Sequence, residues 1–238
     1  INLINMSNIR LFFPESLSIK LSSKLDKSQS HYLAKVMRVS IGQSFSLFNQ
    51  SGEWEAKITE INKGTVGFFI TKKLRSIINE REIWLAFAPI KLNYLNLMIQ
   101  KATELGVTRF IPILTERTIV RKLNQKRINK IIIEASEQSN RLTIPILDEI
   151  IKLKDFLKAN QKTNIIFGDL NTDNSKLNIK GTEPLCILIG PEGDFAVKER
   201  ENILKLKNII PLKINENILR SETAAISMIS IISFNLLS

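Results

Sequence analysis

The sequence predicts a larger α/β domain preceded by a small all-β domain. Short apolar runs separated by glycines fill the first 70 or so residues, which is the spacing of a small antiparallel barrel. The runs are 45–48, 54–61 and 65–70, and the glycines are Gly42, Gly52 and Gly64. Further along, strand-like and helix-like segments alternate, and the strands are continuous apolar runs. Such strands indicate a parallel sheet that helices cover on both faces.

One helix interrupts the all-β domain. Residues 26–38 begin with a capping side chain, Asp26 or Ser28, and continue with apolar residues at helical spacing. The face expected to be buried carries Tyr32, Val36 and Val39. The polar stretch TKKLRSIINERE at 71–82 then separates the two patterns. We place the two domains at residues 1–72 and 73–238.

The α/β domain is expected to contain strands and helices in regular alternation. Gly106 should end the first helix as a left-handed cap, and Ser221 should cap the last one. The expected strands are 83–89, 109–114, 164–168, 185–190 and 209–214. The expected helices are 91–105, 124–140, 197–206 and a final one from residue 222.

Composition and charge narrow the classes of function. The 238 residues carry 34 Lys and Arg against 23 Asp and Glu, a net charge of +11, and this excess favours a polyanionic partner such as nucleic acid. One cysteine and one histidine, Cys186 and His31, cannot form a disulfide or a zinc cluster. The N-terminal stretch lacks a secretion signal, and no long uncharged apolar window occurs. These features predict a cytoplasmic protein without metal or membrane span.

Ligands of open parallel sheets bind beyond the carboxyl ends of the strands. The candidate loops are therefore those after the expected strands 164–168, 185–190 and 209–214. The loop GPEGDF, residues 190–195, has two glycines that let its backbone approach a ligand closely. It lacks the Lys and Ser/Thr of a phosphate-binding loop, and the chain contains no G-x-G-x-x-G motif. These absences argue against a metabolic enzyme that binds another nucleotide.

The loop NENILRSETA, residues 215–224, places a cation immediately before the last helix. The helix dipole opposes a positive charge at this end, so the capping role of Ser221 leaves Arg220 unexplained. An anionic partner would resolve the conflict. Phosphate, a deprotonated base and Glu192 of the neighbouring loop are the candidates.

Five ordered motifs resemble the RsmE family, the 16S ribosomal RNA uridine methyltransferases of the SPOUT superfamily. They are QKATELGVTRFIP (100–112), TERTIVR (115–121), EASEQSNR (134–141), LIGPEGDF (188–195) and ILRSETAAI (218–226). The stretch 30–58 resembles the family's PUA-like RNA-binding β-barrel, so the resemblance covers nearly the whole chain.

The resemblance implies a trefoil-knot methyltransferase domain, S-adenosylmethionine as cofactor and a homodimer. It implies methylation of N3 of a specific uridine in 16S ribosomal RNA, in the assembled small subunit. By position, the cofactor-binding residues are Gly168, Ile189, Gly190, Pro191, Glu192, Gly193, Ile214, Asn215, Ile218, Leu219 and Thr223. Asp194 and Asn215 stand where the family has glycine; Asp194 is expected to face solvent, and a left-handed backbone is expected at Asn215.

Further roles follow from the chemistry of the reaction. N3 of uracil is a nucleophile only when deprotonated, so Arg220 is expected to stabilise the negative charge and Glu222 to accept the proton. The residues expected to bind RNA are Arg10, Lys35, Arg38, Lys72, Lys73 and Arg141, with Arg75 beside them. Those expected to pair two copies are Ala225, Met228, Ile229 and Ile232. His31 and Cys186 are not expected to be catalytic.

Besides the metabolic enzyme that the missing motifs argue against, two alternatives remain open at this point. A SPOUT enzyme could act on the ribose 2′-hydroxyl of transfer RNA, which requires activation of an alcohol instead of a ring nitrogen. A non-catalytic RNA-binding protein would carry its function in the barrel domain and bind no cofactor.

Overall fold

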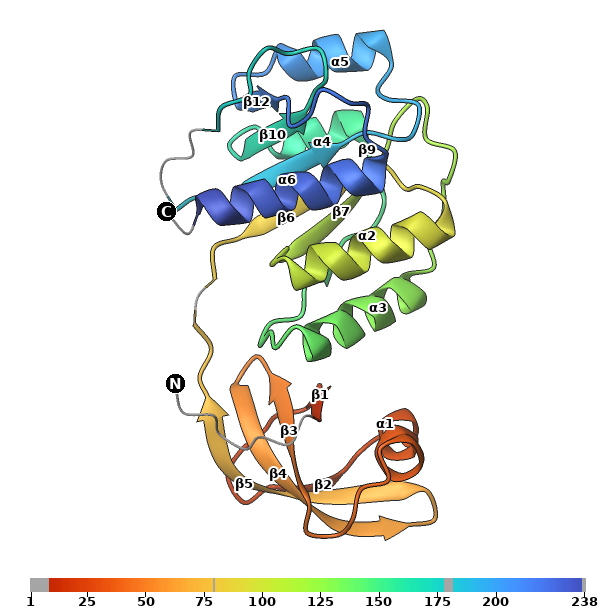
Figure 1. Cartoon of the computed structure of the whole chain (residues 1–238), viewed down its shortest axis with the longest axis vertical. Helices are drawn as coiled ribbons and strands as arrows, with labels where there is room; N and C mark the ends of the chain where they lie inside the picture. Colours follow the sequence, from red (N-terminus) through yellow and green to blue (C-terminus); the bar gives the residue numbers. More distant parts are fainter. Residues whose placement is uncertain (1–8, 79, 178–181, 237–238) are drawn as a thin grey trace. The chain divides into compact units, whose positions relative to one another are not determined.

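The chain folds into two units, each built around its own sheet (Figure 1). The computed structural model describes residues 9–78, 80–177 and 182–236; residues 1–8 of the stretch inspected for a secretion signal lie outside it. Unit 1 comprises Ile1–Asn79 and Ser136–Ile144, and unit 2 comprises Glu80–Ala135 and Pro145–Ser238. Unit 1 thus runs past the expected boundary at residue 72, because strand β5 (Thr65–Arg75) stays paired to its end.

Unit 1 contains a five-stranded sheet. Its order is β1 (Arg10–Phe12), β3 (Ser44–Asn49), β4 (Gly52–Asn62), β5 and β2 (Ser22–Lys24). The pairs β3–β4, β4–β5 and β2–β5 are antiparallel, as the sequence predicts. The pair β1–β3 is parallel instead, because β1 reaches β3 from a distant part of the chain and no hairpin joins them.

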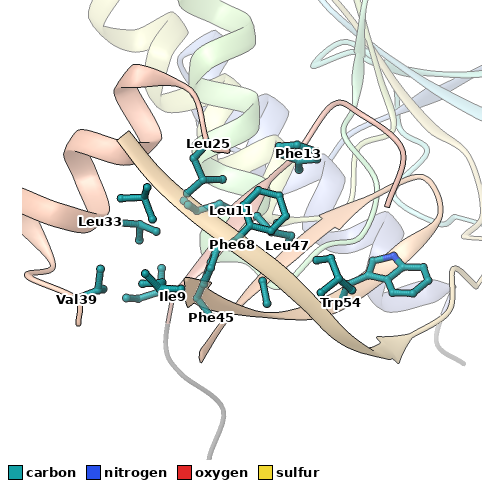
Figure 2. Close-up of a cluster of buried hydrophobic side chains, with 14 of the residues drawn as sticks. Ile9, Leu11, Phe13, Leu25, Leu33, Val39, Phe45, Leu47, Trp54 and Phe68 are labelled. Atoms are coloured by element: carbon teal, nitrogen blue, oxygen red, sulfur yellow. The ribbon is translucent and has the colours of Figure 1, made fainter. Parts of the chain in front are cut away.

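One apolar core fills unit 1, and Figure 2 shows its side chains between the strands and the helical segment. Ile9, Leu11 and Phe13 alternate along the first strand and all point inward, as residues two apart on a strand do. The rings of Phe13 and Phe68 meet edge to face with centroids 5.3 Å apart. This core is built from segments distributed over the first 70 residues.

The helical segment of unit 1 starts where the sequence predicts but ends differently. Asp26 caps α1 (Lys27–His31), accepting a 2.8 Å hydrogen bond from Gln29 N. The chain then widens into a π-helical turn, η1 (Tyr32–Val36), and Arg38 takes a left-handed backbone. This widening changes which residues face inward, so Leu33 is buried while Val36 is 60% exposed. The buried face predicted through Val36 is therefore wrong.

Unit 2 contains a parallel sheet whose strands are buried. The strands are β6 (Ile83–Phe87), β7 (Arg109–Leu114), β8 (Ile146–Leu147), β9 (Ile151–Lys152), β10 (Asn164–Gly168), β11 (Leu185–Ile189) and β12 (Ile209–Leu212). Their order is β12-β10-β11-β6-β7-β8, with β9 paired to β7, and every pair is parallel. The predicted α/β class is confirmed. The short strands β8 and β9 carry too few residues to show a pattern in the sequence.

Helices cover both faces of this sheet. The helices are α2 (Leu92–Glu104), α3 (Gln125–Gln138), α4 (Leu153–Ala159), α5 (Val197–Leu204) and α6 (Ser221–Asn235), and α3 passes into unit 1 at Ser136. α2 and α6 lie side by side, and α6 packs on β11 (Figure 1). Phe156 of α4 and Ile203 of α5 pack with Phe167 of β10, whereas its neighbour Gly168 faces Met228 of α6. Successive strand residues point to opposite faces, so α4 and α5 cover the side away from α6.

Helix α6 belongs to the core of unit 2, which corrects two expectations. Ala225, Met228, Ile229 and Ile232 are fully buried within the chain, so they cannot form a surface that pairs two copies. The sequence of an apolar helix does not show whether the helix packs within its own chain or against a second chain. Ser221 is the first helical residue, and Arg220 occupies the cap position without a side-chain capping bond.

Three smaller expectations can be compared with the structure. Gly106 ends α2 with φ of 98°, as predicted. Cys186 lies in β11 and is fully buried, and desolvation raises the pKa of its thiol to about 12, which agrees with a core residue. Within the described ranges, no helix combines the length and apolar character needed to cross a bilayer.

Candidate functional site

A pocket of about 250 Å³ opens in unit 2 where three loops meet. Strands β12, β10 and β11 are neighbours in the parallel sheet, so their carboxyl ends lie together and the loops after them surround one space. The sequence analysis selects the same loops, because ligands of open parallel sheets bind beyond the carboxyl ends of the strands. The pocket approaches the lower end of small-molecule sites, about 300 Å³.

Most residues expected to bind the cofactor line this pocket. They are Gly168, Ile189, Gly190, Pro191, Glu192, Ile214, Asn215, Ile218 and Leu219. Gly193 and Thr223 do not line it: the Gly193 carbonyl accepts a 2.7 Å hydrogen bond from Arg117, and Thr223 is exposed on α6. The structure adds lining residues that the sequence did not indicate, among them Asp169, Asp194, Lys213 and Met228.

Two glycines that line the pocket have no room for a side chain. A Cβ on Gly168 would stand 2.9 Å from the Met228 sulfur, and a Cβ on Gly190 would stand 2.8 Å from the Phe195 ring. Phe195 cannot easily move away, because it is 4% exposed and its ring packs edge to face on Phe167 at 5.4 Å. A side chain at either glycine would therefore disturb the walls of the pocket.

We expect Gly190→Ala to destabilise unit 2 by about 1–3 kcal/mol, because it overpacks the space beside Phe195. Gly193→Ala is the matched control in the same loop. Its added Cβ would meet nothing closer than Arg117 Cδ at 3.8 Å, and its φ is not positive. Thermal unfolding of the two variants measures the difference. Equal melting temperatures would contradict the close fit assigned to Gly190.

A buried carboxylate forms part of the pocket wall. Asp169 follows β10 directly, is 5% exposed, and accepts two hydrogen bonds from Arg200, at 3.1 and 2.6 Å. The hydrogen bond to Asp169 is the main cause that raises the pKa of Arg200. Asn171 N also donates to the carboxylate, at 3.1 Å. The position of Asp169 immediately after a buried strand is the sequence signal that could have identified this residue.

The two positions that depart from the family's glycines behave differently. Asp194 has φ of 60°, and its carboxylate accepts a 2.7 Å hydrogen bond from Phe195 N, a local bond of the kind that lets Asp adopt this conformation. Its side chain is exposed at the pocket rim. Asn215 is not left-handed, so that expectation is wrong. Its side chain instead accepts a 2.8 Å hydrogen bond from Asn217 N and closes an Asx turn.

Arg220 lies beside the pocket, between the lining residues Leu219 and Ser221. Its guanidinium stands over the ring of Tyr94, 5.4 Å from the centroid, and donates a 3.2 Å hydrogen bond to the Tyr94 hydroxyl. No carboxylate pairs with it in the part of the chain that the structure describes, so Glu192 is not its anionic partner here. The ring orients the guanidinium and leaves its charge uncompensated.

Glu222 is 5% exposed and does not line the pocket. The geometry therefore gives no support to its predicted role as proton acceptor. Across the described residues, no group of three side chains is arranged to hold a metal ion.

The residues expected to bind RNA divide into exposed and buried ones. Lys35, Arg38, Lys72 and Lys73 are exposed. The Arg10 side chain is only 11% exposed; it pairs with Glu53 at 2.9 Å and donates to the carbonyls of Ser136, Glu137 and Arg141. Arg141 itself is 7% exposed. Both side chains are largely covered within unit 1, so they present little surface to phosphates.

Comparisons with known proteins agree with this arrangement. Residues 78–233 match the RNA methyltransferase domain family, and residues 25–69 match the RNA methyltransferase PUA domain. Ribosomal RNA small subunit methyltransferase E of Rickettsia conorii is 36% identical over 205 residues, covering 84% of each chain. That of Buchnera aphidicola subsp. Schizaphis graminum is 30% identical, covering 93% of this chain and 94% of the relative.

Solved structures extend the similarity to three dimensions. Ribosomal RNA small subunit methyltransferase E from Neisseria gonorrhoeae, bound to S-adenosyl methionine, is 26% identical with a TM-score of 0.85. The likeness covers 95% of this chain and 97% of that one. A Legionella pneumophila structure in complex with the cofactor SAM is 28% identical with a TM-score of 0.86, covering 97% and 98%.

The fold, the pocket and the matched domains define the class as RNA methyltransferases with a PUA domain. The pairwise similarities narrow the class further. The chain belongs to the ribosomal RNA small subunit methyltransferase E family.

Proposed function

We propose that this chain methylates N3 of a specific uridine in 16S ribosomal RNA of the small subunit, with S-adenosylmethionine as methyl donor. The observation that carries the proposal is the pocket formed by three strand-end loops in a domain of this family. Relatives of similar fold are described as bound to this cofactor. The cofactor supplies an electrophilic methyl group when bound, so the protein's task is binding and orientation.

The residues at the pocket fit such a group. Gly168 and Gly190 line the pocket at places where a side chain would meet Met228 or Phe195, and Ile189, Leu219 and Met228 provide apolar wall. Hydrogen-bonding groups stand at the edge, including the fixed carboxylate of Asp169. An apolar cavity with a few placed polar groups is typical of cofactor sites.

Arg220 is the residue proposed to act on the RNA base. Loss of the N3 proton spreads negative charge over the uracil ring and its carbonyl oxygens, and a fixed guanidinium beside the pocket would stabilise that anion. The ring of Tyr94 holds the guanidinium without neutralising it. The helix dipole opposes a cation at the start of α6, and the anionic base would offset this by acting as the partner of Arg220.

Calorimetric titration with S-adenosylhomocysteine tests the proposal against its main alternative. An enzyme of this type binds the product in a one-to-one ratio per chain. A non-catalytic RNA-binding protein binds none, and that result would contradict the proposal. No specific observation favours transfer to a ribose 2′-hydroxyl.

The remaining partners follow from the same proposal. We infer a cytoplasmic homodimer that acts on the assembled small subunit and contacts RNA through the exposed cations of unit 1. Large apolar side chains that the protomer leaves exposed support pairing, namely Ile218 at 87% and Phe234 at 71%. Light scattering would give twice the 27.1 kDa chain mass, and the chain mass alone would contradict the dimer.

A further inference from the structure

A run of positive charge lies in unit 2, in a stretch of chain that does not line the pocket. Between Glu116 and Glu134 the chain carries six cations and no acidic residue. They are Arg117, Arg121, Lys122, Lys126, Arg127 and Lys130. The run spans the loop after β7 and the first turns of α3. None of these cations lines the pocket, so cofactor binding does not account for the run.

Four of these cations are exposed and uncompensated. Arg121, Lys122, Lys126 and Arg127, here called the basic segment, have no ion pair with any described residue and lie at the surface. Lys130 differs, because it pairs with Glu134 at 3.7 Å. Uncompensated neighbouring cations repel one another, so their grouping favours an anionic partner.

Two of these cations stand at the start of α3, where the helix dipole adds to their mutual repulsion when no anion is bound. Asn124 accepts a 3.1 Å hydrogen bond from Arg127 N, which marks the beginning of the helix, and its first turn contains no acidic residue. Lys126 and Arg127 therefore stand at the positive end of the helix dipole. A phosphate at this place would interact favourably with both the cations and the dipole.

The basic segment is anchored to the loops of the cofactor pocket. Arg117 donates a 2.7 Å hydrogen bond to the Gly193 carbonyl, and Glu116 N donates to Glu199 at 2.9 Å. Thr115 and Thr118 are buried and share a 2.8 Å hydrogen bond that fixes the turn between them. The chain entering the basic segment is thus held against the GPEGDF loop, while the cations that follow face solvent.

We propose that the basic segment is a phosphate-binding surface for the RNA substrate, positioned next to the methyl-transfer pocket. This inference rests on the proposed function and adds a contact surface within the methyltransferase domain itself. Lysine and arginine side chains on a surface bind the phosphate backbone and set its register without reading sequence. The anchoring through Arg117 and Glu116 keeps this surface at a fixed place relative to the loop that lines the pocket.

The test compares two fourfold variants with the same reduction in charge. One carries Arg121→Gln, Lys122→Gln, Lys126→Gln and Arg127→Gln. The control carries Lys152→Gln, Lys154→Gln, Lys158→Gln and Lys162→Gln, four exposed lysines in and around α4. The probe is a uridine-containing single-stranded RNA oligonucleotide, and its affinity is measured over a series of salt concentrations.

The slope of log affinity against log salt should decrease in magnitude by roughly 0.7 for each phosphate that is no longer neutralised, so by about 2 to 3 in the first variant. The control should keep the wild-type slope, and both variants should bind S-adenosylhomocysteine as the wild type does. An unchanged slope in the first variant, or an equal decrease in the control, would overturn this surface. Failure of the wild type to bind S-adenosylhomocysteine would instead contradict the proposed function.

Discussion

Replacing Arg220 with alanine is expected to lower the rate of methyl transfer by about 100- to 1,000-fold, the usual effect of removing one group that stabilises a developing anion. Cofactor affinity should change little, because Arg220 does not line the pocket. Incorporation of tritiated methyl groups into undermethylated small subunits measures the rate, and titration with S-adenosylhomocysteine measures binding. Full activity in this variant would remove Arg220 from the mechanism.

Two further variants separate the charge of Arg220 from its placement. Arg220→Lys keeps the positive charge but loses the planar group that stacks on Tyr94. Tyr94→Phe keeps the ring and removes only the hydroxyl that accepts the 3.2 Å hydrogen bond. We expect Tyr94→Phe to retain most activity and Arg220→Lys to retain a small part. If Arg220→Lys is as active as the wild type, the stacking on Tyr94 contributes nothing to the reaction.

Replacing Glu53 with alanine is expected to lower the free energy of unfolding of unit 1 by about 3–5 kcal/mol, since it leaves the guanidinium of Arg10, only 11% exposed, without its counter-ion. Glu53 is fully buried on β4 and accepts hydrogen bonds from Arg10, at 2.9 Å, and from Arg75, at 2.6 Å. Burial lowers the pKa of Arg10, and the charge of Glu53 opposes that shift. Arg10 also holds the carbonyls of Ser136, Glu137 and Arg141.

Glu60→Ala on the same strand is the control for Glu53→Ala. Glu60 also forms an ion pair, with Lys24 at 2.8 Å, but its side chain is 44% exposed and screened by water. Its removal should cost less than about 1 kcal/mol. Denaturant unfolding of both variants gives the comparison. A loss of similar size at the two positions would contradict the special role of the buried cluster.

The α/β class and the location of the pocket could be predicted because they depend on local patterns. Continuous apolar runs identify buried parallel strands, and the strand-end rule then selects the loops after β10, β11 and β12. The assignment of Ser136–Ile144 to unit 1 could not be predicted. It depends on Arg10, whose partners lie more than 120 residues away in sequence.

Individual residues are harder to predict, because their surroundings do not show in the sequence. A charged residue does not reveal whether its charge is exposed, so the sequence does not distinguish the largely covered Arg10 and the buried Arg141 from surface cations. The apolar positions of α6 fit a dimer surface and a core equally well by pattern, and the structure shows the core. For Asp169 the position directly after a buried strand is the one signal in the sequence, and it is a weak signal because a single carboxylate forms no motif.

Methyl transfer to N3 of a uridine in 16S ribosomal RNA is tested most directly on the product itself. Undermethylated small subunits are incubated with the purified chain and S-adenosylmethionine, and nucleoside analysis by mass spectrometry identifies the modified atom. We expect 3-methyluridine at a single position of 16S ribosomal RNA, and none when Arg220→Ala replaces the wild type. A 2′-O-methylated nucleoside, or no new methylated nucleoside with the wild-type chain, would contradict this activity.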